Sequence, residues 1–189
     1  DTQVLAQLEI VRSQYLAGRA QEARLIAERD SYREVVFPDD LLAARSDPRV
    51  EEAVAGQQQV FAARSKALNG EKEVLEQRIE QLNEQIRGLE GLSSTKLQRI
   101  ESYKAEIKDF KKLYEKGLTD RLRLREMERL AAELEGERAE HQASMAAAQV
   151  QIGETRLQII QLQRKQQTEV TQELRDTQAK LSDLRERIR

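Results

Sequence analysis

The sequence predicts an all-α protein, a long antiparallel coiled-coil hairpin with a third, shorter helix packed at its base. Three observations support this fold class. Of the 189 residues, 35% are charged and only 4% are aromatic, a composition typical of long helices and coiled coils. The chain contains only two prolines. Apolar residues recur about every 3.5 residues over most of its length, which is the signature of a left-handed coiled-coil seam.

The first helix is expected over residues 1–30. A connector over residues 31–47 follows, in the stretch of residues 31–50 that contains both prolines of the chain. We expect this connector to run back, so that the first helix thickens the base of the hairpin into a three-helix bundle. Asn69–Gly70 is a second possible break. The broad apolar face of the first helix comprises Val4, Leu5, Leu8, Val11, Tyr15 and Leu16.

The outgoing helix is predicted over residues 48–116. Asp47 can accept hydrogen bonds from its free N–H groups, and Pro48 fits its first turn. From Leu75 to Tyr114 the apolar seam advances in strictly alternating steps of four and three residues, which is the strongest structural signal in the chain. Its positions are Leu75, Ile79, Leu82, Ile86, Leu89, Ser93, Lys96, Ile100, Tyr103, Ile107, Phe110 and Tyr114.

The tip turn is predicted at residues 117–120, and the returning helix at residues 121–189. Gly117 can end the outgoing helix in a left-handed conformation, and Thr119 or Asp120 can cap the returning helix. The two arms have matching lengths, roughly 105 Å each at 1.5 Å per residue. A short turn between two such helices favours antiparallel neighbours.

One layer of the predicted seam is polar. Folding the arms about the turn places Lys96 opposite His141, with Arg138 one step nearer the tip and Ser93 on the other side. The long side chains are expected to reach outward to neighbouring acids such as Glu137 and Glu140. Two interpretations remain open: a polar layer that fixes the register of the arms, or a flexing point partway along the hairpin.

The composition excludes several classes of function. His141 is the only histidine and there is no cysteine, so an ordinary zinc site or a catalytic dyad cannot be assembled. We therefore expect no enzyme activity, no metal and no cofactor. A net charge of −2 gives no basis for nucleic-acid binding, and no segment is apolar enough to span a membrane. Helical patterns run into both Asp1 and Arg189, so we expect a fragment of a longer protein.

The predicted tip carries more positive charge than helix capping requires. From Lys108 to Arg125 there are seven basic and three acidic residues, a local excess of +4. Leu118 and Leu122 are expected to be exposed there, with nothing above to cover them. An exposed apolar pair in a basic setting indicates a docking surface.

Two long stretches resemble a known family. "LYEKGLTDRLRLREMERLAAELEGERAE" and "IGETRLQIIQLQRKQQTEVTQELRDTQAKLSDLRERI" are similar to the periplasmic adaptors of type I secretion systems, the membrane fusion proteins of the HlyD family. The branch that exports proteases and lipases is the most similar. The resemblance implies a hairpin that stands on lipoyl-like and β-barrel domains, in a periplasmic protein anchored in the bacterial inner membrane through a missing N-terminal segment. It also implies a TolC-like outer-membrane channel at the tip, an ABC transporter at the membrane end, and assembly into a ring, commonly a hexamer.

The tip departs from the family in one respect. Many members carry an Arg–Leu–Ser/Thr pattern there, and Leu113 matches its leucine, whereas Asp109 and Asp120 occupy the other two positions. The alternative to an adaptor is a generic structural coiled-coil rod or tether. The predicted partner-binding residues are Asp109, Leu113, Tyr114, Lys116, Gly117, Leu118, Thr119, Asp120 and Arg121.

Overall fold

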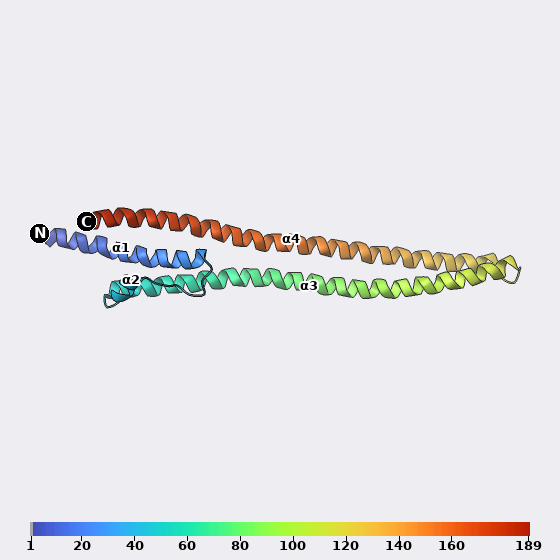
Figure 1. The fold of residues 1–189 in the computed structure, drawn as a ribbon. Coiled ribbons are helices and arrows are strands. Elements are labelled where there is room, and N and C mark those ends of the chain that lie inside the picture. Colours follow the sequence, from blue (N-terminus) through green and yellow to red (C-terminus); the bar gives the residue numbers. More distant parts are fainter. Residues whose placement is uncertain (1) are drawn as a thin grey trace. The chain divides into compact units, whose positions relative to one another are not determined.

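The computed structural model describes residues 2–189. Asp1, where the first helix is predicted to begin, lies outside the described residues. The described chain contains helices and no strand, and the all-α prediction is confirmed. In chain order the helices are α1 (Thr2–Arg29), α2 (Asp39–Ala43), α3 (Pro48–Glu115) and α4 (Arg121–Ile188) (Figure 1). Helix α3 passes through Asn69–Gly70 without a break.

By its internal packing the chain divides into two compact units. Unit 1 comprises Asp1–Glu73 and Ile159–Arg189, and unit 2 comprises Val74–Gln158. Helices α1 and α2 belong to unit 1 alone. Helices α3 and α4 are each divided, with one segment in unit 1 and the other in unit 2.

Unit 1 is built around α1, which packs on both long helices. Towards α3 and the connector, a buried cluster consists of Ala20, Ala23, Phe37, Leu41, Val50 and Val54. Towards α4, Leu25 packs with Val170 and Leu174. Gly18 lies so close to α4 that a Cβ atom there would stand 2.8 Å from Leu181 Cδ2. The predicted third helix at the base is therefore present, and it uses small residues to approach its neighbours closely.

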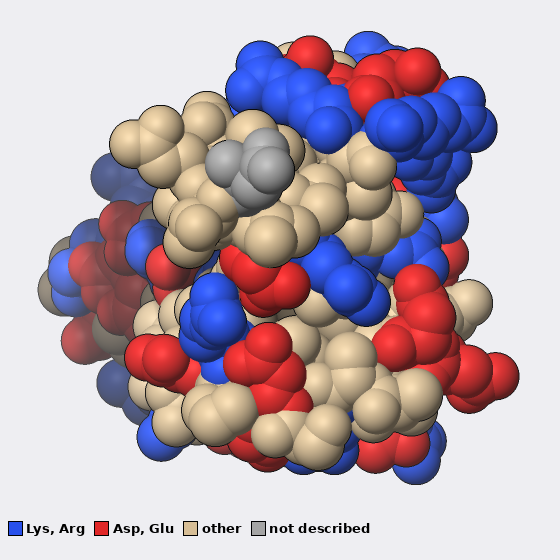
Figure 2. All heavy atoms as spheres, turned by 90° about the vertical axis from the view of Figure 1, so that its left-hand side faces the viewer, with Lys and Arg blue, Asp and Glu red and all other residues tan. Residues whose placement is uncertain are grey.

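The predicted apolar face of the first helix is only partly correct. Val4, Leu5 and Leu8 are exposed, at 70%, 62% and 41%, while Leu16 is half-buried and packs on the α3-side cluster. Figure 1 shows the reason, because the N-terminal end of α1 projects beyond the end of α4 in the same unit. Figure 2 faces this end and shows neutral side chains between groups of both charge signs.

The connector contains a helix that the sequence analysis did not anticipate, the five-residue α2. It follows a tight end to α1, in which the Tyr32 N–H donates to the Ala27 carbonyl at 2.9 Å and the Ser31 N–H to the Glu28 carbonyl at 3.4 Å. This pair of hydrogen bonds is the Schellman motif, in which the first residue after the helix C-cap adopts the left-handed conformation. Ser31 occupies that position with φ 56°, although glycine is the residue that favours it.

Ser31→Gly should therefore stabilise unit 1. Glycine removes the strain that a side chain causes in the left-handed conformation, but it loses more conformational freedom on folding. The difference between these two free energies is a gain in stability of about 0.5–1 kcal/mol. Urea unfolding followed by circular dichroism measures it. The control Ser94→Gly lies within helix α3, where replacing serine with glycine should instead cost up to about 0.5 kcal/mol, since glycine is the poorer helix former. Equal losses from both substitutions would contradict the strain at Ser31.

The start of α3 is as predicted. The Asp47 carboxylate accepts a hydrogen bond from the backbone N–H of Arg49 at 2.9 Å, and Pro48 is the first helical residue. Asp47 and Pro48 together fix where the long helix begins. The Asp47 carboxylate satisfies a backbone N–H that has no partner within the helix, and Pro48 has no N–H that needs one.

A buried ion-pair network joins all three long elements of unit 1, and the sequence analysis missed it. Arg24 on α1 is only 4% exposed. Its guanidinium donates to Gln57 Oε1 at 2.6 Å and to Glu28 Oε1 at 2.7 Å, and lies 3.5 Å from Glu173 Oε2. Arg64 on α3 also reaches Glu173, at 3.1 Å. Glu28 Oε2 is buried without a hydrogen-bond partner in the described chain, so this network is tightly enclosed.

Unit 2 is a two-helix antiparallel coiled coil. Leu82 on α3 packs with Ala148 and Ile152 on α4, with Ile79 and Ile86 beside them. Ion pairs cross between the arms from Lys104 to Glu135 at 2.8 Å and from Lys111 to Glu128 at 3.6 Å. A step of seven residues up α3 therefore matches a step of seven down α4, as a heptad seam requires. The buried positions of the seam include Ile100, Leu124, Met127, Ala131 and Leu134.

Candidate partner-binding tip

The turn at the end of unit 2 ends α3 with a Schellman motif. The Leu118 N–H donates to the Leu113 carbonyl and the Gly117 N–H to the Tyr114 carbonyl, both at 2.9 Å. Gly117 has φ 72°, the left-handed conformation predicted for it. The reversal is thus encoded locally by a glycine at the one position where a side chain would be strained.

Asp120 is the residue that caps α4. Its Oδ1 accepts a hydrogen bond from the backbone N–H of Arg123 at 2.8 Å, and of the two candidates, Thr119 and Asp120, it is the one that holds this bond. Position 120, where many members of the family that this chain resembles carry Ser or Thr, therefore has a structural role in this chain. A carboxylate suits the positive end of a helix at least as well as a hydroxyl does.

The tip presents large apolar side chains to solvent. Leu118 is 70% and Leu122 is 77% exposed, and the exposures of Tyr114 and Leu113 are 42% and 38%. Among the other predicted tip residues, Thr119 is half-buried. Asp109, Lys116, Gly117, Asp120 and Arg121 are exposed.

The positive charge of the tip is only partly neutralised within the chain. Lys112 pairs with Asp109 at 3.8 Å and Arg123 with Glu126 at 3.7 Å. Over the part of the chain that the structure describes, no acidic partner lies within ion-pair distance of Lys108, Lys116, Arg121 or Arg125. Four free cations around exposed leucines form a surface suited to an acidic partner with apolar side chains.

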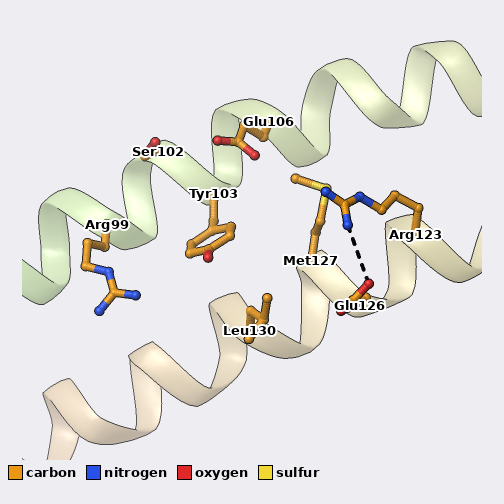
Figure 3. A pocket seen from close by; sticks show the side chains of 8 residues that line it. All are labelled: Arg99, Ser102, Tyr103, Glu106, Arg123, Glu126, Met127 and Leu130. Carbon is orange, nitrogen blue, oxygen red and sulfur yellow. Dashed lines mark ion pairs between the residues drawn. The ribbon is translucent and has the colours of Figure 1, made fainter.

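A groove of about 350 Å³ lies between the arms near the tip (Figure 3). Figure 3 shows Tyr103 of α3 with Met127 and Leu130 of α4 in the space between the two helices, while Arg99 and Arg123 lie towards opposite ends. An apolar centre with charged ends can accept one or two side chains of a partner helix. It is too open to enclose a small molecule.

The four members of the predicted polar seam layer differ in burial. Ser93 is buried, at 7% exposure, and Lys96, Arg138 and His141 are half-buried. Lys96 forms an ion pair with Glu137, one of the two acids expected to pair with this layer, whereas Glu140 forms no ion pair within the described chain. The hydrogen bond and charge of Lys96, together with the nearby Arg99 and His141, hold the pKa of the Glu137 carboxyl below its ordinary value. Arg138 Nε is buried and has no partner in the described residues.

Between the two interpretations of this layer, we expect a fixed register. Both α3 and α4 continue through it without interruption, and the Lys96–Glu137 pair links the arms there. Amide hydrogen exchange should therefore show protection in residues 92–97 equal to that in the turns on either side. Faster exchange confined to these residues would instead identify a flexing point.

No group of three or more His, Cys, Asp or Glu side chains that could hold a metal ion occurs within residues 2–189. In the same residues, no helix combines the length and apolar character needed to cross a lipid bilayer.

Comparisons with known proteins agree with this architecture. Residues 4–189 match the family described as "AprE, long alpha-helical hairpin". The chain is 32% identical over 186 residues to the type I secretion system membrane fusion protein PrsE of Rhizobium meliloti (strain 1021). That match covers 98% of this chain but only 42% of PrsE. The crystal structure of the soluble domain of LipC, a membrane fusion protein of a type I secretion system, superimposes with a TM-score of 0.93 at 32% identity, covering 98% of this chain and 87% of that one.

Proposed function

We propose that this chain, which belongs to the family of AprE long α-helical hairpins, is the hairpin of a periplasmic adaptor in a type I protein secretion system. The adaptor bridges an ABC transporter of the inner membrane to a TolC-like outer-membrane channel, which the tip contacts. Copies stand side by side in a ring, and a segment outside the 189 residues anchors the protein in the inner membrane. The relatives PrsE and LipC are both membrane fusion proteins of type I secretion systems, which supports this role.

The structural observation that carries the proposal is the tip. A Schellman motif and an N-cap fix the turn, so Leu118 and Leu122 are held exposed among unpaired cations. Exposed leucines at a rigid reversal contribute little to the stability of a monomer, and their presence is explained by a partner that covers them.

The mechanism is mechanical and interfacial. Each long helix has 68 residues, which corresponds to about 100 Å at 1.5 Å per residue. A helix pair of that length sets a distance between two partners, and the transporter supplies the energy for export. The chain itself performs no chemical step.

Deletion of the gene tests this function. We expect one or a few proteins to disappear from the culture medium and to be restored by the wild-type gene on a plasmid. Photo-crosslinking from an unnatural amino acid at Leu118, in the complemented strain, should then capture an outer-membrane channel protein. The same amino acid at Val36, exposed but far along the chain in unit 1, is the control. An unchanged set of secreted proteins would refute the adaptor role and favour a structural rod.

A further inference from the structure

Helix α4 carries a second apolar seam in unit 2, on a face that the hairpin does not use. The positions advance in alternating steps of four and three residues, the same period as the buried seam. All of them are exposed, and none is polar or charged. They are Ala132, Gly136, Ala139, Ala143, Ala146, Val150, Gly153 and Leu157. We call this set the α4 outer seam.

Nothing within the described chain explains the α4 outer seam. Val150 and Leu157 are 62% and 55% exposed. A Cβ atom built on Gly136 or Gly153 would meet no atom within 4 Å, so neither glycine is needed for a close intrachain contact. Glycine is unfavourable in a helix interior relative to alanine, and an uncharged stripe is unusual in a chain that is 35% charged.

Helix α3 presents a matching set on its own outward face. These residues are likewise exposed and follow the same alternation of three and four, and Glu84 is the single charged member. Gly88 and Gly91 also have no atom within 4 Å of a built Cβ. The α3 outer seam comprises Gln81, Glu84, Gly88, Gly91, Thr95, Gln98, Ser102 and Ala105.

The two outer seams lie at the same levels of unit 2. The ion pairs Lys104–Glu135 and Lys111–Glu128 and the buried seam fix which residues of α3 and α4 are level. Each residue of one outer seam then has a level counterpart in the other, and every layer except Leu157 with Gln81 contains at least one small residue. The layers, α4 residue first, are Ala132 with Ala105, Gly136 with Ser102, Ala139 with Gln98, Ala143 with Thr95, Ala146 with Gly91, Val150 with Gly88, Gly153 with Glu84, and Leu157 with Gln81.

We propose that the α4 outer seam of one copy packs, antiparallel, against the α3 outer seam of the next copy. Rotation about an axis parallel to the helices leaves levels unchanged, so a ring of side-by-side copies brings these layers together without a shift. The contact is heterologous, because two different faces meet, and such contacts form a ring when the rotation from copy to copy closes. This inference rests on the proposed function in one respect only, since the ring of the adaptor supplies the second copy.

The residues that flank the two outer seams support this pairing. Glu140 beside the α4 seam is level with Arg99 beside the α3 seam, and neither forms an ion pair within the described chain. Ala147 is level with Leu92, a leucine that is 53% exposed in the single chain. In an antiparallel helix pair these flanking positions face each other, so one copy would cover the exposed leucine of the next.

Disulfide crosslinking tests the contact directly, because the chain has no cysteine of its own. The variant carrying both Gly91→Cys and Ala146→Cys, made in the complete gene product and oxidised in intact cells, should give a ladder of covalent oligomers. Either substitution alone should give none, because the contact is heterologous. The double variant Gly91→Cys with Ser144→Cys is the matched control, since Ser144 is also exposed, lies at nearly the same level and is outside the outer seam. No ladder, or equal ladders from both double variants, would overturn the proposal.

A second pair of variants separates this inference from the adaptor function. Ala143→Glu with Val150→Glu puts two charges into the α4 outer seam, and Ser144→Glu with Gln151→Glu puts them one residue further on, at exposed positions outside it. We expect both variants to melt like the wild type, and the first alone to lose the ladder and at least tenfold of export. Normal assembly and export by the first variant would overturn the inference while leaving the adaptor role intact. If the wild-type gene itself restores no export, the adaptor role fails instead.

Discussion

Replacing Arg24 with methionine should destabilise unit 1 by about 3–5 kcal/mol, the usual cost of breaking a buried ion pair by removing one partner. The methionine would fill most of the space but would leave the Glu28 carboxylate, whose side chain is 3% exposed, without its closest cation. Gln57 would lose a 2.6 Å hydrogen bond at the same time. Arg64 cannot compensate, since it is 3.7 Å from Glu28 and already engaged with Glu173.

Chemical unfolding measures the loss of stability, and amide hydrogen exchange of the folded protein shows where in the chain it occurs. Protection should fall in α1 and in the α4 segment of unit 1, while residues 74–158 keep the protection of the wild type. Arg19→Met is the control on the same helix. The Arg19 side chain is 23% exposed, against 5% for Arg24, and it is shared between Glu22 at 3.2 Å, which is 16% exposed, and Asp40 at 3.4 Å, which is 59% exposed. This substitution should cost no more than about 1 kcal/mol. If both variants lost similar amounts of stability, the buried network would contribute no more to the fold than an ordinary surface ion pair does.

The same network makes unit 1 sensitive to acid. Partial burial alone would raise the pKa of the Glu173 carboxyl, but the hydrogen bond from Arg64 and the charges of Arg64 and Arg24 outweigh it and hold the pKa below its ordinary value. A carboxyl whose pKa is lower in the folded state stabilises the fold above its unfolded pKa. That contribution is lost as the pH falls through the folded pKa, so acid should weaken unit 1 through this residue.

Much of the fold could be predicted from the sequence because its determinants are local or periodic. The seam from Leu75 to Tyr114 needs only the heptad period, and the turn needs only a glycine followed by a capping side chain. The start of α3 follows in the same way from Asp47 and Pro48. These signals act within a few residues, so no knowledge of tertiary packing is required.

The features that the sequence analysis missed depend on segments that are distant in the chain. Arg24, Gln57 and Glu173 look like ordinary surface residues until α1, α3 and α4 are brought together. The exposure of Val4 and Leu5 was missed for the opposite reason, because an apolar pattern cannot show whether a neighbouring helix extends far enough to cover it. Helix α2 was also missed, since five residues are too few for a periodic signal.

At the tip, the sequence placed the turn but left its chemistry open. Either Thr119 or Asp120 could have been the cap, and only the hydrogen bond to the Arg123 N–H distinguishes them. With Asp120 occupied as a cap, the apolar residues and the free cations remain as the contacts available to a partner.

Replacing both Leu113 and Leu118 with glutamine should reduce export at least tenfold while leaving the melting temperature within a few degrees of the wild type. Both side chains are already exposed, at 38% and 70%, so the substitution removes little buried apolar area from the monomer. In a docked complex the same side chains would be fully covered, and a covered anchor residue typically contributes 2 kcal/mol or more to binding, about thirtyfold in affinity. Quantifying secreted protein in the culture medium, with melting followed by circular dichroism, measures both quantities.

The control for the tip variant is Ile10→Gln with Val36→Gln, which removes two comparably exposed apolar side chains, at 56% and 67%, from unit 1. It should export normally, because neither residue belongs to the turn. Normal export by the Leu113 and Leu118 variant would refute docking through these leucines, and contact through Lys116 and Arg121 would then have to account for any binding. A large fall in melting temperature would have another meaning, since Leu113 and Leu118 also provide the two ends of the Schellman hydrogen bond. That bond joins backbone atoms, which glutamine supplies equally well, so we expect the turn to survive and the loss of export to report on contact alone.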